Sequence, residues 1–449
     1  MVRAVVEKAP EFILGETDTS QLEKYLSIHD ITDVEGRYLH WSKLKWRVEP
    51  RAEAKNIWLA IKLKRRLQSK YVPIKDAKGE LFSYCIPHSM EAKLHQVVKI
   101  AGGSTAAISG EAASRQLKGH FLVSSLIMEE AISSAQLEGA AVTREVAKRM
   151  LETSSEPKNE DERMILNNYL LLKHAERSCK LSLTLDLILE FHKIATMGTT
   201  ENGVIPGSFR EADDIYVEDK SGDIAYQPPS HELIVQRLSI LCHFANEDHS
   251  GLNGSKFIPP VIKAIILHFM IGFEHPFRDG NGRTARALFY WFMLKNDYDL
   301  FKYVSISKLL KDNPKEYGMS YMYTETDQND LTYFIDYQLD IILKAFEDLQ
   351  KYLAEKASQF SEAIGLLESS QYSGKLNFQQ KDIIKKAIKN PGRVFTVSEI
   401  SSDYEISDNT ARTYLNTLLK YKLLLSSKDG RTTLYIAPSD LRERLKFNT

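Results

Sequence analysis

Apolar residues recur at the spacing of an α-helix through most of residues 110–350. Each amphipathic run predicts a helix with one buried face, and the runs cover residues 121–132, 159–178, 184–197, 230–246, 259–273, 284–294 and 332–359. The run 259–273 begins with two prolines and is apolar on nearly all sides, so we expect it to be the buried central helix of a bundle. The pattern predicts a mostly α fold.

One stretch between these helices has β-prone residues instead. Ile215, Tyr216 and Val217 form one short run, residues 224–226 form another, and the polar turn 219–223 between them contains a glycine. Two such runs around a glycine-containing turn predict a β-hairpin. A plain surface hairpin is one interpretation, and an edge that holds another chain by strand addition is the other.

The two ends of the chain differ from this helical centre. Residues 1–109 are mixed in pattern, with a helix-like run at 52–67, and predict a small α-rich extension. The helical domain would then occupy residues 110–359. Residues 360–375 are mostly small and polar, which is typical of a linker, and a separate domain is expected at 376–449.

The C-terminal domain is predicted to be a winged helix-turn-helix. Helical runs at 376–389, 397–404 and 407–421 precede strand-like residues on both sides of Asp429-Gly430, a favoured hairpin turn. From Leu376 onward there are 13 Lys or Arg and 8 Asp or Glu, a net charge of +5, which leaves −6 for the remainder because the whole chain carries −1.

A basic module of this kind indicates DNA binding through the exposed face of its third helix. The residues expected on that face are Asn409, Thr410, Arg412, Thr413 and Asn416. The alternative is a contact with protein, and Asp408 and Glu405 dilute the basic character of this face.

Composition limits the remaining possibilities only slightly. The charged fraction of 27% and the hydrophobic fraction of 43% are those of a soluble globular protein, and a net charge of −1 excludes no partner. A homo-oligomer stays possible. Cys85, Cys179 and Cys242 match no disulfide or metal pattern, which favours the cytoplasm. The N-terminus lacks the apolar core of a signal peptide, and the longest apolar helix carries Lys263 and His268, so we expect no membrane span.

The chemistry is concentrated in twelve residues, 275–286, which read His-Pro-Phe-Arg-Asp-Gly-Asn-Gly-Arg-Thr-Ala-Arg. They lie between two predicted helices and begin with a titratable base, His275. Gly280 and Gly282 permit positive φ and close backbone approach, so that consecutive N–H groups can face one anion. Phosphate is the expected anion.

The charged residues of this loop fit the same ligand. Arg283 and Arg286 are three residues apart, which lets both guanidiniums reach phosphate oxygens from the first turn of the following helix. Asp279 suits a hard cation that bridges phosphates. The loop therefore predicts a site for a nucleoside triphosphate with Mg²⁺.

These residues resemble the Fic family signature His-x-Phe-x-(Asp/Glu)-Gly-Asn-Gly-Arg-x-x-Arg at every specified position. The resemblance implies a Fic-type helical bundle that transfers AMP from ATP to a Ser, Thr or Tyr hydroxyl of a target protein and of itself. It implies the following roles: His275 is the general base, Asp279 holds Mg²⁺, Gly280, Asn281 and Gly282 form the anion hole, and Arg283 and Arg286 grip the phosphates. It also makes the hairpin at Ile215, Tyr216 and Val217 a flap that positions the target.

An upstream segment resembles the inhibitory motif of the same family, (Ser/Thr)-x-x-x-Glu-(Gly/Asn). Ser134, Glu138 and Gly139 supply it, after the apolar run 121–132, and Gly139 is a natural helix stop. The resemblance implies that Glu138 inhibits the enzyme in cis by pairing with Arg286. A solvent-exposed Glu beside a helix-ending glycine is the alternative.

Two other functions stay open at this level. One is a transcription regulator whose Fic domain senses nucleotide, and the other is a hydrolase that removes AMP with Glu138 positioning water. One departure from a common family pattern is the bulky run Phe289-Tyr290-Trp291-Phe292, which leaves the shape of the nucleotide pocket and a strict preference for ATP open. Gly282 stands where a phosphoryl-transferring subset carries a larger residue, which favours nucleotidyl transfer.

Overall fold

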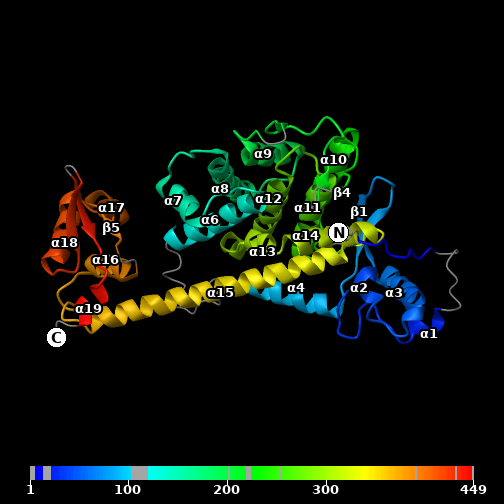
Figure 1. The fold of residues 1–449 in the computed structure, drawn as a ribbon, viewed down its shortest axis with the longest axis horizontal. Helices are drawn as coiled ribbons and strands as arrows, with labels where there is room; N and C mark the ends of the chain where they lie inside the picture. The colour runs from blue at the N-terminus through cyan, green and yellow to red at the C-terminus, as the bar shows by residue number, and fades with distance from the viewer. Residues whose placement is uncertain are drawn as a thin grey trace, which may run out of the picture. The chain divides into compact units, whose positions relative to one another are not determined.

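The structure is a computed structural model, and it describes residues 6–13, 22–102, 120–200, 203–218, 224–252, 254–389, 392–429 and 432–446. Figure 1 shows that most of the chain is helical, as the apolar pattern predicts. The chain divides into two compact units, Met1–Leu349 and Gln350–Thr449, which are described separately. Within the described ranges, no helix is both long enough and apolar enough to cross a membrane.

The first unit begins with the N-terminal extension. Its elements are α1 (Glu23–Leu26), α2 (Trp41–Leu44), η1 (Arg51–Glu53), α3 (Ala54–Gln68), β1 (Lys70–Lys75), β2 (Leu81–Tyr84) and α4 (His88–Ala101). The antiparallel β1–β2 pair is a feature that the α-rich prediction missed. The outer edge of β2 also bonds to the chain before α15, since the Leu331 N–H donates to the Ser83 carbonyl at 2.8 Å.

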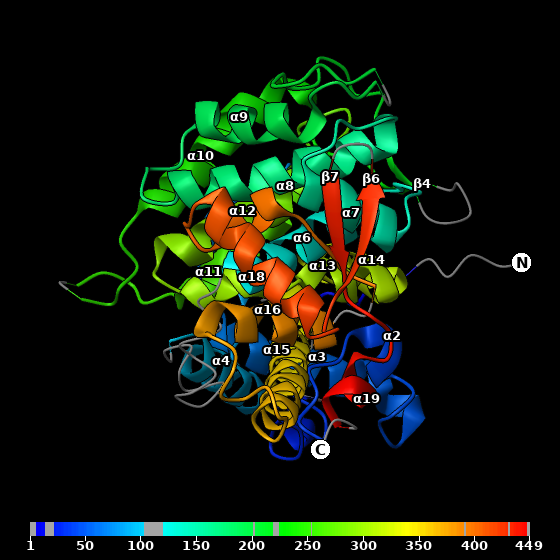
Figure 2. The same cartoon turned by 90° about the vertical axis from the view of Figure 1, so that its left-hand side faces the viewer.

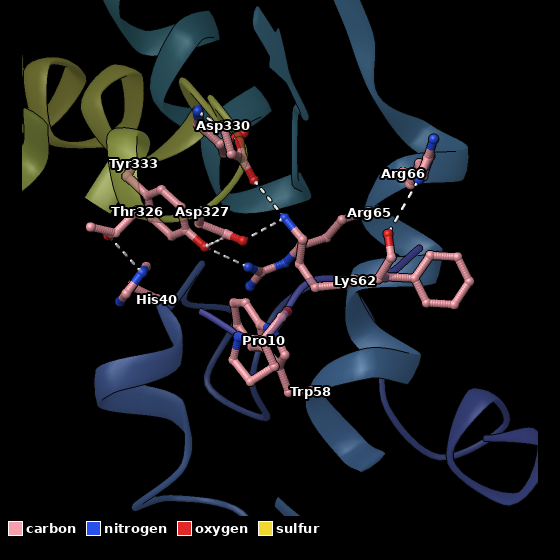
Figure 3. Close-up of polar contacts among 12 residues, drawn as sticks. Pro10, His40, Trp58, Lys62, Arg65, Arg66, Thr326, Asp327, Asp330 and Tyr333 are labelled. Carbon is pink, nitrogen blue, oxygen red and sulfur yellow. Dashed lines mark hydrogen bonds and ion pairs between the residues drawn. The ribbon is translucent and has the colours of Figure 1, made fainter. Parts of the chain in front are cut away.

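A buried polar cluster joins this extension to the turn between α14 (Pro314–Thr326) and α15 (Thr332–Glu368) (Figure 3). Lys62 on α3 pairs with Asp327 at 2.9 Å, and both side chains are less than 10% exposed. Arg65 on the same helix donates to the Tyr333 hydroxyl at 2.8 Å, and that hydroxyl donates to Asp327 at 2.7 Å. Because Lys62 is ion-paired and Arg65 is hydrogen-bonded inside the protein, the extension packs as part of the first unit.

The helical bundle supplies most of the rest of this unit. Its elements are α6 (His120–Leu137), α7 (Arg144–Thr153), α8 (Glu160–Ser178), α9 (Leu185–Thr196), η3 (His231–Leu233), α10 (Ile234–Asn246), α11 (Pro260–Glu274), α12 (Asn281–Lys295), η4 (Asp299–Tyr303), α13 (Ile306–Asp312), α14 and α15. Side chains on all sides of α11 are buried, as expected for the central helix, and α12 packs along it.

The bulky run after the loop belongs to the core. The Tyr290 hydroxyl donates to the Val304 carbonyl at 3.1 Å, and the Trp291 indole donates to the Ser178 carbonyl at 3.0 Å. Phe289 and Phe292 are also no more than 4% exposed. These four side chains therefore hold α12 in place by packing in the core of the bundle.

Helix α6 runs beyond the apolar run 121–132 to Leu137, so Ser134 is helical, and Gly139 follows with a φ of 107°, as expected for a glycine that ends a helix. Two other boundaries differ from the sequence prediction. Helix α12 begins at Asn281, which places Gly282 in its first turn without the positive φ that we expected. Helix α15 continues to Glu368 through part of the expected linker, because Ala and Leu residues there favour helix and Leu367 is buried.

The hairpin is present but short. Strand β3 (Val217–Glu218) pairs with β4 (Ile224–Tyr226) in an antiparallel arrangement with a register shift. Ile215 and Tyr216 precede β3, and the Tyr216 side chain is 43% exposed. The predicted turn at 219–223 lies outside the described residues.

The second unit has its own core. After the end of α15 it contains α16 (Phe378–Lys389), β5 (Val394–Phe395), α17 (Val397–Asp403), α18 (Asp408–Lys420), β6 (Leu425–Asp429), β7 (Thr432–Ile436) and α19 (Leu441–Lys446). Figure 2 shows α18 and the β6–β7 pair. The strands form an antiparallel sheet in the order β5-β7-β6, and β5 was not predicted. Gly430 of the expected turn lies outside the described residues, and the winged-helix assignment stays a prediction.

Candidate functional site

The loop between α11 and α12 holds the candidate base in an unusual backbone conformation. His275 ends α11 with φ 44° and ψ 57°, the left-handed region, and its N–H donates to the Ile271 carbonyl at 3.0 Å. A residue with a Cβ pays roughly 1–2 kcal/mol for this conformation. The surrounding contacts must therefore hold it in place.

The imidazole of His275 is oriented by its own helix. Its Nδ1 lies 3.4 Å from the Gly272 carbonyl oxygen, which accepts a hydrogen bond. This contact favours the tautomer with the proton on Nδ1 and a lone pair on Nε2. Burial lowers the pKa of His275, while the Gly272 carbonyl and the Glu138 carboxylate partly oppose this. The ring is therefore neutral at pH 7, as a general base must be.

The Asn281 side chain fastens the loop. Its amide oxygen accepts from the Phe277 N–H at 3.0 Å, and its amide nitrogen donates to the Phe277 carbonyl at 2.8 Å. Phe277 is fully buried and stacks on the His192 ring with the centroids 3.7 Å apart. Both polar atoms of the Asn281 side chain are therefore engaged within the loop.

His192 is a residue of the site that the sequence reading missed. Its Nε2 lies 3.0 Å from the Asp279 carbonyl, and its Nδ1 accepts from the Gly207 N–H at 3.1 Å. Burial lowers the pKa of His192 to about 4, so the ring is neutral and donates from Nε2. This contact, made by a helix more than 80 residues upstream, shapes the loop that carries Asp279.

The start of α12 has the properties of an anion site. Gly280 precedes the helix with a φ of 81°, and among the described residues no side chain caps the first N–H groups of the helix. A Cβ on Gly280 would lie 2.7 Å from a Thr196 carbon, so only glycine fits this turn. The anion hole of Gly280, Asn281 and Gly282 stays a prediction, which the uncapped start of the helix allows.

Arg283 and Asp279 are paired with each other. An Arg283 Nη2 hydrogen bond joins the carboxylate, and Nη1 donates to the Ala195 carbonyl at 2.9 Å. The buried Nε of Arg283 has no hydrogen-bond partner in the part of the chain that the structure describes. The Arg283 guanidinium is therefore only partly satisfied by the described residues.

The Asp279 carboxylate is the candidate cation ligand. Searching the described ranges finds no group of three or more His, Cys, Asp or Glu side chains that could hold a metal. Mg²⁺ bound with a nucleotide needs only one or two protein carboxylates, because phosphates and water complete its shell. Asp279, whose side chain is 15% exposed at the helix start, fits that requirement.

Arg286 and Glu138 meet directly. Nη2 of Arg286 lies 2.8 Å from Glu138 Oε1, and Nε donates to the Ser134 hydroxyl at 3.0 Å. Burial acts to raise the pKa of Glu138, but the guanidiniums of Arg286 and Arg283 outweigh it and leave that pKa below its usual value. The carboxylate is therefore ionised, and the expected Glu138–Arg286 pair is present.

Helix α6 is firmly attached to the bundle, which holds Glu138 in this position. The buried Glu130 carboxylate accepts from the Ser305 hydroxyl at 2.7 Å and from the Ser307 N–H at 3.0 Å. Lys311 donates to Gln136 at 2.7 Å. Sequence periodicity does not reveal these contacts with α13.

Gly282 leaves room for the Glu138 carboxylate. A Cβ built on Gly282 would overlap Oε1 of Glu138 and would lie 2.9 Å from Nη1 of Arg286. Glycine is required here by close approach and not by φ.

We expect Gly282→Ala to destabilise the protein by about 1–3 kcal/mol because the added methyl group overpacks this contact. In the Glu138→Gly background the cost should fall, giving a coupling of about 1 kcal/mol or more in a double-mutant cycle of chemical unfolding. Gly318→Ala is the matched control, since a Cβ there meets nothing within 4 Å. Additive effects of the two substitutions would show that the carboxylate does not fill this space.

Arg210, which precedes the hairpin, connects the flap to the loop by hydrogen bonds. The sequence did not reveal this role. The Nε of Arg210 donates to the His275 carbonyl at 3.0 Å, and its backbone N–H donates to the Pro276 carbonyl at 2.9 Å. A second link comes from Arg278, which pairs with Asp214 at 3.0 Å. Ile215, Tyr216 and Val217 follow this anchor.

The predicted DNA-binding residues lie on α18. Ser407 caps this helix by accepting from the Thr410 N–H at 3.2 Å, as expected, and Asn409, Arg412 and Thr413 are exposed. The amide oxygen of Asn416, however, accepts from the Tyr435 hydroxyl of β7 at 2.8 Å. Asn416 therefore joins the hairpin to α18 as well as lying on the exposed side.

Comparison with known proteins identifies the family of the central part. Residues 182–293 match the model of the Fic/DOC family. The chain is 31% identical over 170 residues to protein adenylyltransferase Fic of Drosophila virilis, covering 37% of this chain and 32% of that protein. It is 29% identical over 239 residues to the Drosophila melanogaster protein of the same name, covering 51% and 45%.

The chain thus spans less than half the length of the curated relatives that it matches. A solved Fic family protein from Desulfovibrio desulfuricans G20 aligns with 77% of this chain and 95% of its own, at a TM-score of 0.48 and 16% identity. The matched segment contains the flap, the loop and most of α12, whereas α6 with Glu138 lies before it. With the loop geometry and the family match together, residues 182–293 are a Fic domain.

Proposed function

We propose that this protein is an adenylyltransferase that moves AMP from ATP to a Ser, Thr or Tyr hydroxyl of a protein. The observation that carries the proposal is the neutral His275 imidazole beside the start of α12, with buried guanidiniums on the same helix. The relatives named protein adenylyltransferase Fic support the same reaction.

In this reaction Nε2 of His275 takes the proton of the target hydroxyl, whose oxygen attacks the α-phosphorus of ATP. The bond to the bridging oxygen breaks, and pyrophosphate leaves. The N–H groups at the start of α12 and the Arg283 guanidinium neutralise charge on the phosphates. Asp279 would hold Mg²⁺, which supplies positive charge for the phosphates and the leaving group.

Glu138 would inhibit this reaction by occupying Arg286. The Fic resemblance assigns Arg286 to the γ-phosphate, and the carboxylate at 2.8 Å takes the same guanidinium. A nucleotide bound in its presence would have its γ-phosphate displaced and its α-phosphate misaligned. We therefore propose that the protein is autoinhibited in cis.

The test is incubation of the full chain with Mg²⁺ and ATP labelled at the α-phosphate, with γ-labelled ATP in parallel. Label retained on protein only from the α-position supports AMP transfer. Label retained from both positions in equal amounts shows bound ATP, and label from the γ-position alone shows phosphoryl transfer. Release of AMP from a pre-modified protein would favour the hydrolase in which Glu138 positions water.

A second proposal concerns the unit Gln350–Thr449, where we infer DNA binding through α18. The observation that favours it is the exposed row Asn409, Arg412 and Thr413 on a helix braced by the β6–β7 pair through Asn416. This activity would be independent of AMP transfer.

We expect Arg412→Glu to weaken binding of mixed-sequence DNA at least about 10-fold at low salt and to flatten the salt dependence, because phosphate contacts dominate such binding. Lys148→Glu makes the same charge change on α7 and should leave affinity near that of the parent. Fluorescence anisotropy with a salt series measures both. Equal affinities for the two variants would favour a protein partner for α18.

A further inference from the structure

Arg210 contacts three segments: the loop that carries His275, the residues before β3 and the residues after β4. The last two are called the legs of the flap. The Arg210 side chain is fully buried, and its Nε, Nη1 and Nη2 all donate to groups of the loop and the flap, so the guanidinium is engaged within the protein. We propose that Arg210 is the positioning residue of His275 and that it couples the flap to the base, an inference that rests on the proposed AMP transfer.

On the side of the base, Arg210 stabilises the left-handed conformation of His275. The Nε hydrogen bond at 3.0 Å fixes the direction of the His275 carbonyl, and the backbone hydrogen bond at 2.9 Å fixes the carbonyl of Pro276. These two carbonyls define the peptide planes that follow the base. Because φ of 44° is unfavourable for histidine, loss of these contacts should let the backbone relax and turn the imidazole away.

On the side of the flap, the same guanidinium holds both legs. Its Nη1 donates to the Ala212 carbonyl at 3.0 Å and pairs with Asp213 at 2.6 Å, and its Nη2 donates to the Pro229 carbonyl. Asp213 in turn accepts from the His231 N–H at 2.7 Å. The legs before β3 and after β4 are therefore closed by one planar group.

This arrangement gives the flap a direct mechanical connection to the base. The guanidinium is planar, and its donors point in fixed directions, so a shift of either leg must move the group that holds the His275 carbonyl. A target segment that orders the flap would order His275 with it. Lysine cannot replace this geometry, because an ammonium at the end of a flexible chain has no planar fork.

Charge and geometry at Arg210 can be separated experimentally. Burial is the main cause of the lowered pKa of His275, the Arg210 cation adds to it, and Glu138 on α6 and Asp279 in the loop act in the opposite direction. Removing the cation should raise the pKa of His275 and move the acid limb of the pH profile to higher pH. Arg210→Lys should keep that limb in place, whereas Arg210→Met should shift it.

The experiment uses the full chain carrying Glu138→Gly, in which transfer is expected to be measurable. We expect Arg210→Lys and Arg210→Met each to lower the rate constant of self-labelling about 100-fold, since a displacement of about 1 Å at a reacting group has that effect. The KM for ATP should stay within about twofold of the parent, because Arg210 does not reach the phosphates. Arg278→Gln is the matched control: it also removes an arginine contact to the flap, in which Arg278 donates hydrogen bonds to the Asp214 carboxylate.

Nuclear magnetic resonance of ¹⁵N-labelled histidine gives a readout that does not need activity. The His275 nitrogens should change shift in both Arg210 variants and keep the parent shifts in Arg278→Gln. Unchanged His275 shifts in folded Arg210→Met would overturn the proposal, as would equal loss of rate in the control. If the parent Glu138→Gly protein transfers no AMP, the proposed function fails, and the histidine shifts still decide whether Arg210 positions His275.

Discussion

His275→Asn is expected to lower AMP transfer by at least about 100-fold, and up to about 10,000-fold, because no other neutral base replaces the imidazole at this position. Asparagine tolerates the left-handed backbone at residue 275 better than alanine does, so the loop should keep its shape. Binding of Mg-ATP should persist, since the N–H groups of α12 and the Arg283 guanidinium are unchanged. Transfer is measured with α-labelled ATP in the Glu138→Gly background, and binding by calorimetry.

His275→Ala should give the same loss of transfer, and the comparison separates base chemistry from backbone strain. A variant that loses both transfer and nucleotide binding has a disturbed loop and says nothing about the base. Undiminished labelling by a folded His275→Asn protein would remove His275 from the mechanism, because the target hydroxyl would then lose its proton to another group.

Glu138→Gly is expected to raise self-labelling about 100-fold, because freeing Arg286 allows the phosphates to align and a misplacement of about 1 Å has a cost of that order. The 2.8 Å ion pair is the contact that must be lost. Glu138→Gln should give a smaller rise, since the amide still fills the space beside Gly282 but no longer carries the charge. Rates are measured at saturating ATP, so that a change in affinity is not mistaken for a change in turnover.

Two further variants test that explanation. Combining Glu138→Gly with Arg286→Ala should abolish most of the gain, because the freed guanidinium is gone. Glu129→Gln, on the same helix but paired with Arg144, should leave labelling unchanged. Equal labelling by Glu138→Gly and its parent, with fold and nucleotide binding verified, would mean that residues 134–139 are only the end of α6.

The Fic loop could be identified from the chain alone, because its contacts are local. His275, Gly280 and Asn281 act within a stretch of a few residues: a helix end, a turn with positive φ and an amide that bridges to Phe277. Such features depend on residue types at fixed short spacing. The helices on both sides of the loop could also be predicted, because the apolar residues recur at helical spacing.

Other features depend on residues far apart in sequence, which periodicity does not connect. Gly282 was read as a turn residue, yet it is helical and is needed for the approach of Glu138 from α6. The expected linker from residue 360 is partly helix, because α15 extends to Glu368 and Leu367 is buried among residues of the second unit. The β1–β2 pair was missed because a two-stranded ribbon of mixed pattern has little signal of its own.

By itself, the sequence determined the mostly α architecture, the place of the loop 275–286 and the residue types that the loop offers for the proposed phosphate and proton chemistry. Only the tertiary structure decided how those residues are used. It pairs Glu138 with Arg286, stacks His192 on Phe277, and joins the flap to the base through Arg210. The physical reason is that helices and turns depend on residues close together in the chain. The pairing of buried charges depends on which distant segments pack against each other and exclude water from the charges.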